Sequence, residues 1–350
     1  MGPCGHGQAP IKNINPLSPT LPSEGGVGAK RRGEDRKLMK PLLIGTRGSK
    51  LALAQTTWVA DALRAAHPGL DIETRIIGTR GDASQASNVP LSSFAEKGIF
   101  AKELETALQA GEIDLSVHSM KDLEHTLPDG LVIAAVPPRE DPRDALVGST
   151  LDALPLGARV GTGSVRRRAL LLSRRPDLTL LEIRGNIDTR LRKWREGQYD
   201  AICLAVAGLN RLGLQDNISE ILDPEWFTPD PGQGALAIEA RSGDRRVRDL
   251  LLPLDDAVSS ANVAAERAFL RAIGGGCKTP IGALAMGYGW EMAARAMAAS
   301  PDGKQILRYE TQGESSASSD WSPDEHGQAL AEGLMAQGAG RLLGDNEAGR

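Results

Sequence analysis

The sequence predicts an α/β protein with largely parallel sheets, made of two similar domains and a third region. From residue 41 onward, short apolar runs alternate with helical patterns in the order strand, turn, helix. Two pairs of segments also match: IGTRGSKLAL resembles VGTGSVRRRAL, and GEIDLSVHS resembles GQYDAICLA. Such pairs indicate an internal repeat, although chance similarity between short segments remains the alternative.

The elements of the first domain follow from the chain in order. PLLIGTRG is a predicted strand, and SKLALAQTTWVADALRAAHPG is a helix with Ser49 as its N-cap and Pro68–Gly69 as its end. LDIETRIIGTRGD is a second strand, GIFAKELETALQAG a helix, and IDLSVHSMKD a third strand. The proline-rich stretch VPPREDPRDALV is then a predicted hinge.

The second domain repeats this order, and a third region follows it. ARVGTG is a strand and SVRRRALLLSRRP a serine-capped helix; DLTLLEIRGN, IDTRLRKWREG and YDAICLAVAGLNRLG continue the alternation. WFTPDPGQGALAIEAR is a predicted return crossing into an apolar strand, Ala235–Glu239. The third region starts near LDDAVSSANVAAERAFLRAIGGGC, which is a predicted helix that ends at the glycines. The short strands PIGALAMGYG, WEMAARAMAAS and KQILRYETQGE come next, and a last helix closes the chain.

Composition excludes several classes of protein. Residues 1–39 are rich in Gly, Pro and Ser without apolar periodicity, so we expect them to be disordered. The net charge of −4 and 3% aromatic content argue against a nucleic-acid partner. No apolar run reaches transmembrane length, and the first forty residues lack the apolar core of a signal peptide, so we expect a cytoplasmic protein without a membrane partner.

The three cysteines, Cys4, Cys203 and Cys277, are scattered and form no disulfide framework or zinc pattern, so no metal is expected. Cys277 follows three glycines, on the loop between a helix and a small predicted sheet. A lone cysteine on such a turn is ordinarily a free, half-buried thiol.

Arginine is concentrated between Gly161 and Arg195, a segment that contains nine Arg and one Lys but only three acidic residues. A solvated helix face is the usual explanation of such a run. However, Arg166 and Arg167 fall in the first turn of a helix, where cations oppose the helix dipole unless an anion lies in front of them. Similar strand-to-helix turns carry Arg47 with Ser49, and Arg184 with Arg190. We therefore expect helix ends that face one cleft and bind carboxylates or phosphates.

The segment VHSMKD places Ser119, Lys121 and Asp122 at the carboxyl end of a predicted strand, the edge where α/β proteins bind ligands. A lone aspartate among arginines stays ionised. Such a carboxylate is useful if the reacting species becomes cationic. His118 lies within the strand, and we expect it to be a core or supporting residue.

Eight motifs in order resemble the porphobilinogen deaminase family, also called hydroxymethylbilane synthases. They are IGTRGSKLALAQ, EKGIFAKELE, VHSMKD, GTGSVRRR, IRGNIDTRL, LAVAGLNRLG, PGQGALAIE and GGGCKTPIGA. The resemblance runs from about Leu42 to about Gly344. It implies two domains like type II periplasmic binding proteins and a third, small α/β domain that carries the cofactor cysteine. The expected bounds are 40–138 plus about 233–253, then 139–232, then 254–350.

The resemblance also implies the chemistry. Family members condense four porphobilinogen molecules head to tail, release ammonia each time through a cationic azafulvene, and hydrolyse the product to hydroxymethylbilane in tetrapyrrole and haem biosynthesis. It implies a monomer with a dipyrromethane cofactor joined to Cys277 by a thioether, and Asp122 matches the catalytic aspartate. The other matches are Lys121, Ser164, Arg166 and Arg167 for the cofactor, Arg47, Ser49, Lys97, Arg184, Arg190 and Arg211 for substrate carboxylates, and Phe100 for the lid. From these roles we expect Arg167→Ala to damage binding more than folding.

Three positions depart from the family pattern: Ser93 replaces a lysine, Glu96 a glycine and Glu124 a proline. They affect the expected lid and substrate affinity, not the reaction. Two other functions fit part of the pattern. A two-lobed anion-binding protein needs neither Asp122 nor the Cys277 loop, and a cysteine hydrolase needs a general base that no motif supplies.

Overall fold

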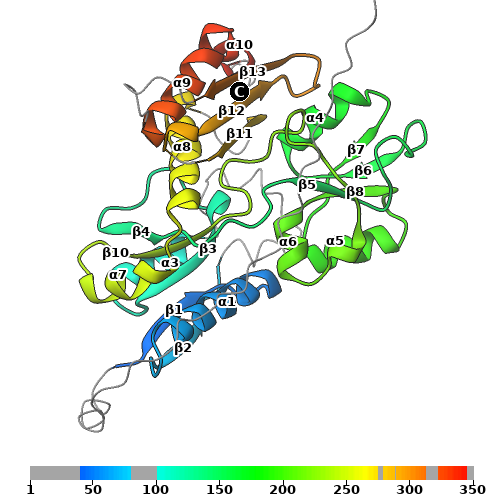
Figure 1. Ribbon diagram of the computed structural model, residues 1–350. Helices are drawn as coiled ribbons and strands as arrows, with labels where there is room; N and C mark the ends of the chain where they lie inside the picture. Colours follow the sequence, from blue (N-terminus) through cyan, green and yellow to red (C-terminus); the bar gives the residue numbers. More distant parts are fainter. Residues whose placement is uncertain (1–39, 80–100, 275–278, 288, 313–321, 345–350) are drawn as a thin grey trace, which may run out of the picture. The chain divides into compact units, whose positions relative to one another are not determined.

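The computed structural model describes residues 40–79, 101–274, 279–287, 289–312 and 322–344. The chain divides into two compact units, Met1–Lys40 and Pro41–Arg350, and the elements below belong to the second. The described ranges contain two five-stranded sheets and one three-stranded sheet, which confirms the predicted α/β class (Figure 1). Within these ranges, no helix is both long and apolar enough to cross a bilayer. The tail of residues 1–39, with its predicted disorder, lies outside them.

The first sheet is mostly parallel, with one antiparallel strand inserted late in the chain. Its strand order is β2 (Ile72–Ile76), β1 (Leu42–Thr46), β3 (Leu115–Ser119), β10 (Leu236–Arg241) and β4 (Leu131–Ala135). Helix α1 (Lys50–Ala66) follows β1, and the Ser49 hydroxyl caps it by accepting from the Ala52 amide at 3.2 Å. The remaining elements are α3 (Lys102–Gln109), α7 (Arg245–Leu251) and the 3₁₀ turn η3 (Met120–Asp122).

The second sheet repeats this plan. Its order is β7 (Thr179–Leu181), β6 (Arg159–Gly161), β8 (Ala201–Ala205), β5 (Asp144–Val147) and β9 (Ile218–Ile221). In each sheet the fourth strand, β10 or β5, is antiparallel to both of its neighbours. Each of these two strands directly follows an irregular segment that connects the two sheets. Ser164 caps α4 (Val165–Arg174) after β6, as Ser49 caps α1 after β1. The shared order confirms the predicted internal repeat. Helices α5 (Ile187–Arg195) and α6 (Val206–Arg211) and the turn η4 (Gln215–Asn217) complete the region.

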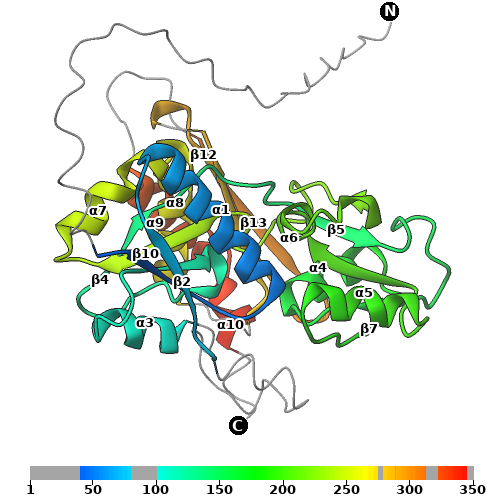
Figure 2. The ribbon, with the colours of Figure 1, turned by 90° about the horizontal axis from the view of Figure 1, so that it is seen from below.

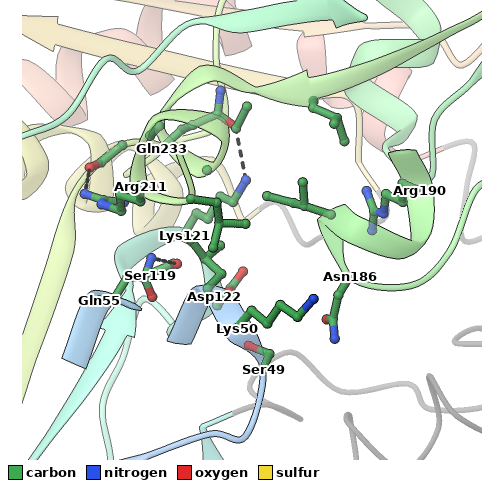
Figure 3. Close-up of a pocket in the computed structure, with 18 of the residues that line it drawn as sticks. Ser49, Lys50, Gln55, Ser119, Lys121, Asp122, Asn186, Arg190, Arg211 and Gln233 are labelled. Atoms are coloured by element: carbon green, nitrogen blue, oxygen red, sulfur yellow. Dashed lines mark hydrogen bonds between the residues drawn. The ribbon is translucent and has the colours of Figure 1, made fainter. Parts of the chain in front are cut away.

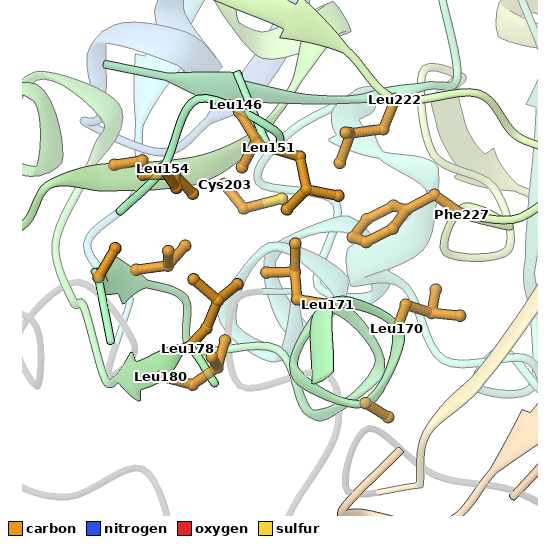
Figure 4. Close-up of a cluster of buried hydrophobic side chains, with 14 of the residues drawn as sticks. Leu146, Leu151, Leu154, Leu170, Leu171, Leu178, Leu180, Cys203, Leu222 and Phe227 are labelled. Atoms are coloured by element: carbon orange, nitrogen blue, oxygen red, sulfur yellow. The ribbon is translucent and has the colours of Figure 1, made fainter. Parts of the chain in front are cut away.

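Leucine side chains build much of the core of the second sheet (Figure 4). They surround Phe227 and the side chain of Cys203, both fully buried. Burial raises the pKa of the Cys203 thiol to about 12, so this cysteine stays protonated and unreactive. Met297 and Ala299 from the third sheet join the same cluster, which ties the second and third sheets together.

The three short strands predicted for the third region are present as β11 (Ile281–Met286), β12 (Ala293–Ala299) and β13 (Ile306–Gln312). They pair as an antiparallel meander. Helices α8 (Ala257–Ile273) and α9 (Pro323–Ala336) pack against each other and share an apolar cluster with the sheet (Figures 1 and 2). Asp256 caps α8 at its start, and Gly274, with φ +67°, ends it in the left-handed conformation. The predicted last helix is divided in two, because a turn at Gly338 separates α9 from α10 (Ala339–Gly344). Short turns η5 (Leu252–Leu254) and η6 (Gly289–Glu291) complete the elements.

Two irregular segments, residues 136–143 and 228–235, connect the first and second sheets. They run side by side, because the Glu140 amide donates to the Gly234 carbonyl at 3.2 Å. The predicted hinge stretch differs from the structure at its end: its last residues, DALV, form strand β5, which is buried at every position. Strands β4 and β9 and helix α7 are further elements that the sequence pattern did not separate from their surroundings.

Candidate active site

A cavity of about 280 Å³ lies at the carboxyl end of β3, between residues of the first and second sheets (Figure 3). This is close to the lower limit of small-molecule sites, roughly 300 Å³. Its lining carries six cationic side chains and two carboxylates, a positive excess within a chain of net charge −4. The charged lining residues are Arg47, Lys50, Lys121, Arg167, Arg190, Arg211, Asp122 and Asp188.

The first sheet supplies the wall that holds Asp122. Strand β3 ends at Ser119, and the 3₁₀ turn then places Lys121 and Asp122 at the cavity. Ser119 accepts a hydrogen bond from the Gln55 amide nitrogen at 2.9 Å, which ties the end of β3 to α1. Figure 3 shows Gln55, Ser119, Lys121 and Asp122 together, with Asn186 and Arg190 on the facing side. Asp122 also lines an adjoining cavity of about 40 Å³, so its carboxyl group lies where two spaces meet.

The second sheet supplies the facing wall through the start of α5. Gly185 has φ +105°, and an added Cβ there would lie 2.7 Å from the Thr189 Cγ2 atom, so the turn requires glycine. Arg190 donates from Nε to the Gly185 carbonyl at 2.7 Å. Burial, followed by the charge of Arg167, lowers the pKa of Arg190 to about 10. An anion in the cavity would therefore stabilise the charged form of Arg190.

Arg211, at the end of α6, and Lys121, in the turn after β3, both donate hydrogen bonds to the segment that returns to the first sheet. Arg211 donates to the Gly234 carbonyl at 2.6 Å, and Lys121 donates from Nζ to Gln233 Oε1 at 3.1 Å. Burial lowers the pKa of Arg211, and burial together with the charge of Arg167 lowers the pKa of Lys121. Their direct partners in these bonds are neutral oxygens, so the cationic charge of each remains available to a ligand anion.

The anion in front of Arg166 and Arg167 is a carboxylate of the chain itself. Asp144 on β5 is fully buried and accepts from Arg166 Nη2 at 2.8 Å and from Arg167 Nη2 at 2.6 Å. Burial opposes ionisation of Asp144, but the two arginines outweigh it and lower its pKa to about 2. Asp144 thus compensates the unfavourable position of two cations at the N-terminus of α4.

The structure brings most of the predicted site residues together. Seven line the cavity: Arg47, Ser49, Lys121, Asp122, Arg167, Arg190 and Arg211. Three do not: Ser164 acts as the cap of α4, Arg166 points to Asp144 and to the Thr228 carbonyl, and Arg184 pairs with Glu182. Lys97, Phe100 and Cys277, and the departures Ser93 and Glu96, lie outside the described residues. Glu124 is exposed and does not line the cavity.

His118 has the supporting place that the sequence indicates. It is buried on β3, 2.8 Å from the Ser116 hydroxyl and 3.2 Å from a carboxylate oxygen of Glu239. Other arginines of the run have acidic partners in the chain: Arg175 pairs with Asp177, and Arg192 pairs with Glu196 on the surface. The run is therefore not one continuous anion-binding surface.

Sequence reasoning did not single out several residues of the cavity, although the motifs contain them. Gln55 lies in IGTRGSKLALAQ, Gln233 in PGQGALAIE, and Asp188 in IRGNIDTRL. Asp188 forms an exposed ion pair with Lys50 at 3.1 Å, which joins the starts of α5 and α1. Neutral amides carry no charge signal in the sequence, and the sequence does not show that Lys50 and Asp188 pair, so these roles follow only from the contacts in the structure.

Comparison with known proteins identifies the family of this chain. A profile described as "Porphobilinogen deaminase, dipyromethane cofactor binding domain" matches residues 42–249, and one described as "Porphobilinogen deaminase, C-terminal domain" matches residues 260–336. The chain belongs to the porphobilinogen deaminase family. The predicted resemblance is thus confirmed, and the matched description names the dipyrromethane cofactor that the resemblance implied.

Individual family members are similar over nearly their whole length. A protein named porphobilinogen deaminase from Roseiflexus castenholzii is 52% identical over 305 residues, 86% of this chain and 98% of that protein. One from Acidithiobacillus ferrooxidans is 48% identical over 307 residues, 87% and 97% of the two chains.

Similar solved structures include periplasmic proteins. The periplasmic VFT2 domain of Bordetella pertussis BvgS is 17% identical and covers 65% of this chain and 92% of its own, with a TM-score of 0.37. A periplasmic substrate-binding protein from Coxiella burnetii is 14% identical, covers 65% and 96%, and also has a TM-score of 0.37. Similarity at this level does not assign a fold, and the α/β class rests on the three sheets.

Proposed function

We propose that this chain is a hydroxymethylbilane synthase. It would join four porphobilinogen molecules head to tail on a covalently held dipyrromethane and then release hydroxymethylbilane by hydrolysis. Each addition breaks the C–N bond of an aminomethyl group, releases ammonia, forms one C–C bond and frees one proton from the attacked pyrrole carbon. The observation that carries the proposal is the cavity that cationic side chains from two sheets line together with Asp122.

The residues present suit a poly-carboxylated cofactor. The Nε atoms of Arg166 and Arg167 are buried and have no hydrogen-bond partner among the described residues, so donors remain near the cavity. Lys121 and Arg167 would hold cofactor carboxylates, and Cys277 would supply the thioether sulfur. When bound, the dipyrromethane supplies the free pyrrole carbon to which the first substrate is added.

Side chains of the cavity would then have two roles, binding of the substrate carboxylates and stabilisation of positive charge. Arg47, Arg190 and Arg211 would bind the acetate and propionate groups of porphobilinogen as planar carboxylates. Asp122 would accept hydrogen bonds from pyrrole N–H groups and stabilise positive charge on the carbon that loses ammonia. Asp122 suits this task because no described residue forms an ion pair or hydrogen bond with its carboxylate.

Incubation of the purified protein with porphobilinogen tests the proposal. We expect four molecules of ammonia for each molecule of hydroxymethylbilane, with the product detected as uroporphyrin after cyclisation and oxidation. An anion-binding protein would bind porphobilinogen without ammonia release, and a cysteine hydrolase would give no porphyrin. Either of those results would reject the synthase.

The division into domains and the state in solution are part of the same proposal. We propose domains at 40–138 plus about 233–253, at 139–232 and at 254–350, which agree with the membership of the three sheets. We also propose a cytoplasmic monomer, based on the family resemblance and the sequence composition. Limited proteolysis with mass spectrometry would locate the domain boundaries, and light scattering during gel filtration would measure the molecular mass.

A further inference from the structure

The side-chain amide of Gln233 lies between two cations that come from different sheets. Gln233 is fully buried on the segment that returns to the first sheet. Its Oε1 atom accepts from Lys121 Nζ at 3.1 Å and from Arg167 Nη2 at 3.4 Å. Lys121 follows β3 of the first sheet, and Arg167 lies on α4 beside the second, so one oxygen contacts both walls of the cavity.

The amide nitrogen of Gln233 also forms two hydrogen bonds. Its Nε2 atom donates to Asp144 Oδ1 at 2.9 Å and to the Pro142 carbonyl at 2.7 Å. The orientation of the amide follows from this chemistry, because the reversed amide would point N–H groups at an ammonium and a guanidinium. Asp144 in turn holds Arg167 at 2.6 Å. Gln233, Asp144 and Arg167 thus form a closed set of contacts that reaches Lys121.

We propose that Gln233 is a positioning residue of the active site, which holds the Lys121 ammonium and the Arg167 guanidinium so that both face the same bound carboxylates. The inference rests on the proposed function, because it assigns the two cations to substrate or cofactor carboxylates. It adds a residue to which neither the motif match nor the arginine pattern gave a role.

The neutrality of the amide is what makes this arrangement useful. A carbonyl oxygen holds a cation without cancelling its charge, so Lys121 keeps its attraction for a ligand anion. Arg166 and Arg167 share the single carboxylate of Asp144 and therefore keep one net positive charge between them. A glutamate at position 233 would add a negative charge that cancels one of these positive charges. It would also place a second carboxylate against Asp144, where the amide now donates a hydrogen bond at 2.9 Å. Both effects would weaken anion binding.

Lys121 depends on this oxygen because its surroundings otherwise disfavour its charge. Burial and the nearby guanidinium of Arg167 lower the pKa of Lys121. The acidic groups that act in the opposite direction are Asp230 on the return segment, Asp122 on the same turn and Asp144 on β5. No ion pair between Lys121 and any of them occurs among the described residues, so Gln233 supplies its direct hydrogen-bonded acceptor.

The test measures the protonation of the Lys121 amine in two variants of Gln233. Gln233→Leu removes the acceptor and should lower the pKa of the Lys121 amine, whereas Gln233→Glu supplies a carboxylate and should raise it. Labelling of the intact protein with acetic anhydride over a pH series, with peptide mass spectrometry, reports the neutral fraction of Lys121. At a fixed pH we expect this fraction to rise about threefold or more in the leucine variant and to fall about threefold or more in the glutamate variant.

A control and an activity measurement complete the experiment. Gln198→Glu makes the same amide-to-carboxylate change at an exposed site and should leave both the labelling of Lys121 and turnover unchanged. Both Gln233 variants should raise KM for porphobilinogen by about tenfold, the size expected for weakening a charged hydrogen bond. If the leucine variant does not fold, circular dichroism will show it, and the near-isosteric glutamate variant decides alone.

The outcomes separate this inference from the proposed function. Labelling of Lys121 that stays at the parent value in the glutamate variant, or an unchanged KM, would overturn the positioning role. Failure of the parent protein to release ammonia from porphobilinogen would instead overturn the synthase, while the labelling result would still report whether Gln233 controls Lys121.

Discussion

Replacing Asp144 by asparagine removes the carboxylate that Arg166 and Arg167 both contact, while the side chain keeps its size and shape. Asp144 is fully buried, and the two arginines are 3% and 7% exposed. Arginine does not lose its proton in proteins, so the variant would hold two buried guanidinium groups close together without their shared anion. The amide of the new asparagine would also present N–H donors to one of them.

The size of the loss follows from the buried contacts. Breaking a buried ion pair by removing one partner costs about 3–5 kcal/mol, because the other charge is left uncompensated. The shift of the Asp144 pKa from 3.8 to about 2 gives a lower estimate. It corresponds to about 2 kcal/mol between the ionised and protonated folded states. We therefore expect Asp144→Asn to lower the free energy of unfolding by about 2–5 kcal/mol.

The pH dependence has a definite sign. Because the folded pKa of Asp144 is depressed, its contribution is fully present above the unfolded value of 3.8 and is lost as the pH falls through about 2. Parent and variant should therefore differ by the same amount at pH 7 and pH 5. The difference between them should shrink only in strong acid, where the parent carboxylate also becomes protonated.

Thermal unfolding at pH 7 and at pH 5 measures this effect. We expect the midpoint to fall by at least roughly 3 °C. Hydrogen exchange should show that β5 and the start of α4 lose protection first. Asp61→Asn is a matched control, because Asp61 pairs with Arg64 at 2.9 Å on the exposed surface of α1, and such pairs contribute about 0–1 kcal/mol. If both variants unfolded within about 1 °C of the parent, the contacts of Asp144 with the two arginines would not contribute to stability.

The remaining predictions concern the reaction and the cofactor. Asp122→Asn should leave the melting temperature unchanged but lower kcat on the order of 100-fold, because a neutral amide cannot stabilise a developing cation; near-normal turnover would remove Asp122 from the mechanism. Cys277→Ser should be inactive, lighter than the parent by the mass of two linked pyrroles and easier to unfold by heat, since a ligand held only by the folded state stabilises it; an active parent with unmodified Cys277 would contradict this. Arg190→Ala should raise KM for porphobilinogen about tenfold, whereas Arg192→Ala, which loses only an exposed pair with Glu196, should not; equal effects would show that Arg190 has no specific role.

Much of the fold could be predicted because its signals are local. The caps Ser49, Ser164 and Gly274 and the apolar strand runs each depend on residues close together in the chain, and the structure confirms them. The internal repeat was also visible, since similar sequences form similar strand-turn-helix units. Strand β5 was not separated from the hinge, because its four residues become a strand only by pairing with β8 and β9.

The site was predicted less completely. Seven predicted residues line the cavity, because motifs at the carboxyl ends of strands meet at one edge of a sheet. Arg166 shows the limit of this reasoning: its place in a helix's first turn indicated an anion, and that anion is Asp144, whose partnership had no sequence signal. The structure also changes the expectation for Arg167→Ala, since removal of a buried partner of Asp144 should affect folding as well as binding.

The sequence alone determined the class of fold, the internal repeat, the family and the type of charge that the site collects. Each of these depends on patterns within one segment or on ordered motifs. Tertiary structure decided which cations reach the cavity and which are neutralised within the protein. Gln233 and Lys121 are 112 positions apart, and Asp144 lies 22 and 23 positions before its two arginines. Such contacts depend on how sheets pack and strands cross, and burial, which a sequence does not display, then sets whether each charge is held by the protein or left for a ligand.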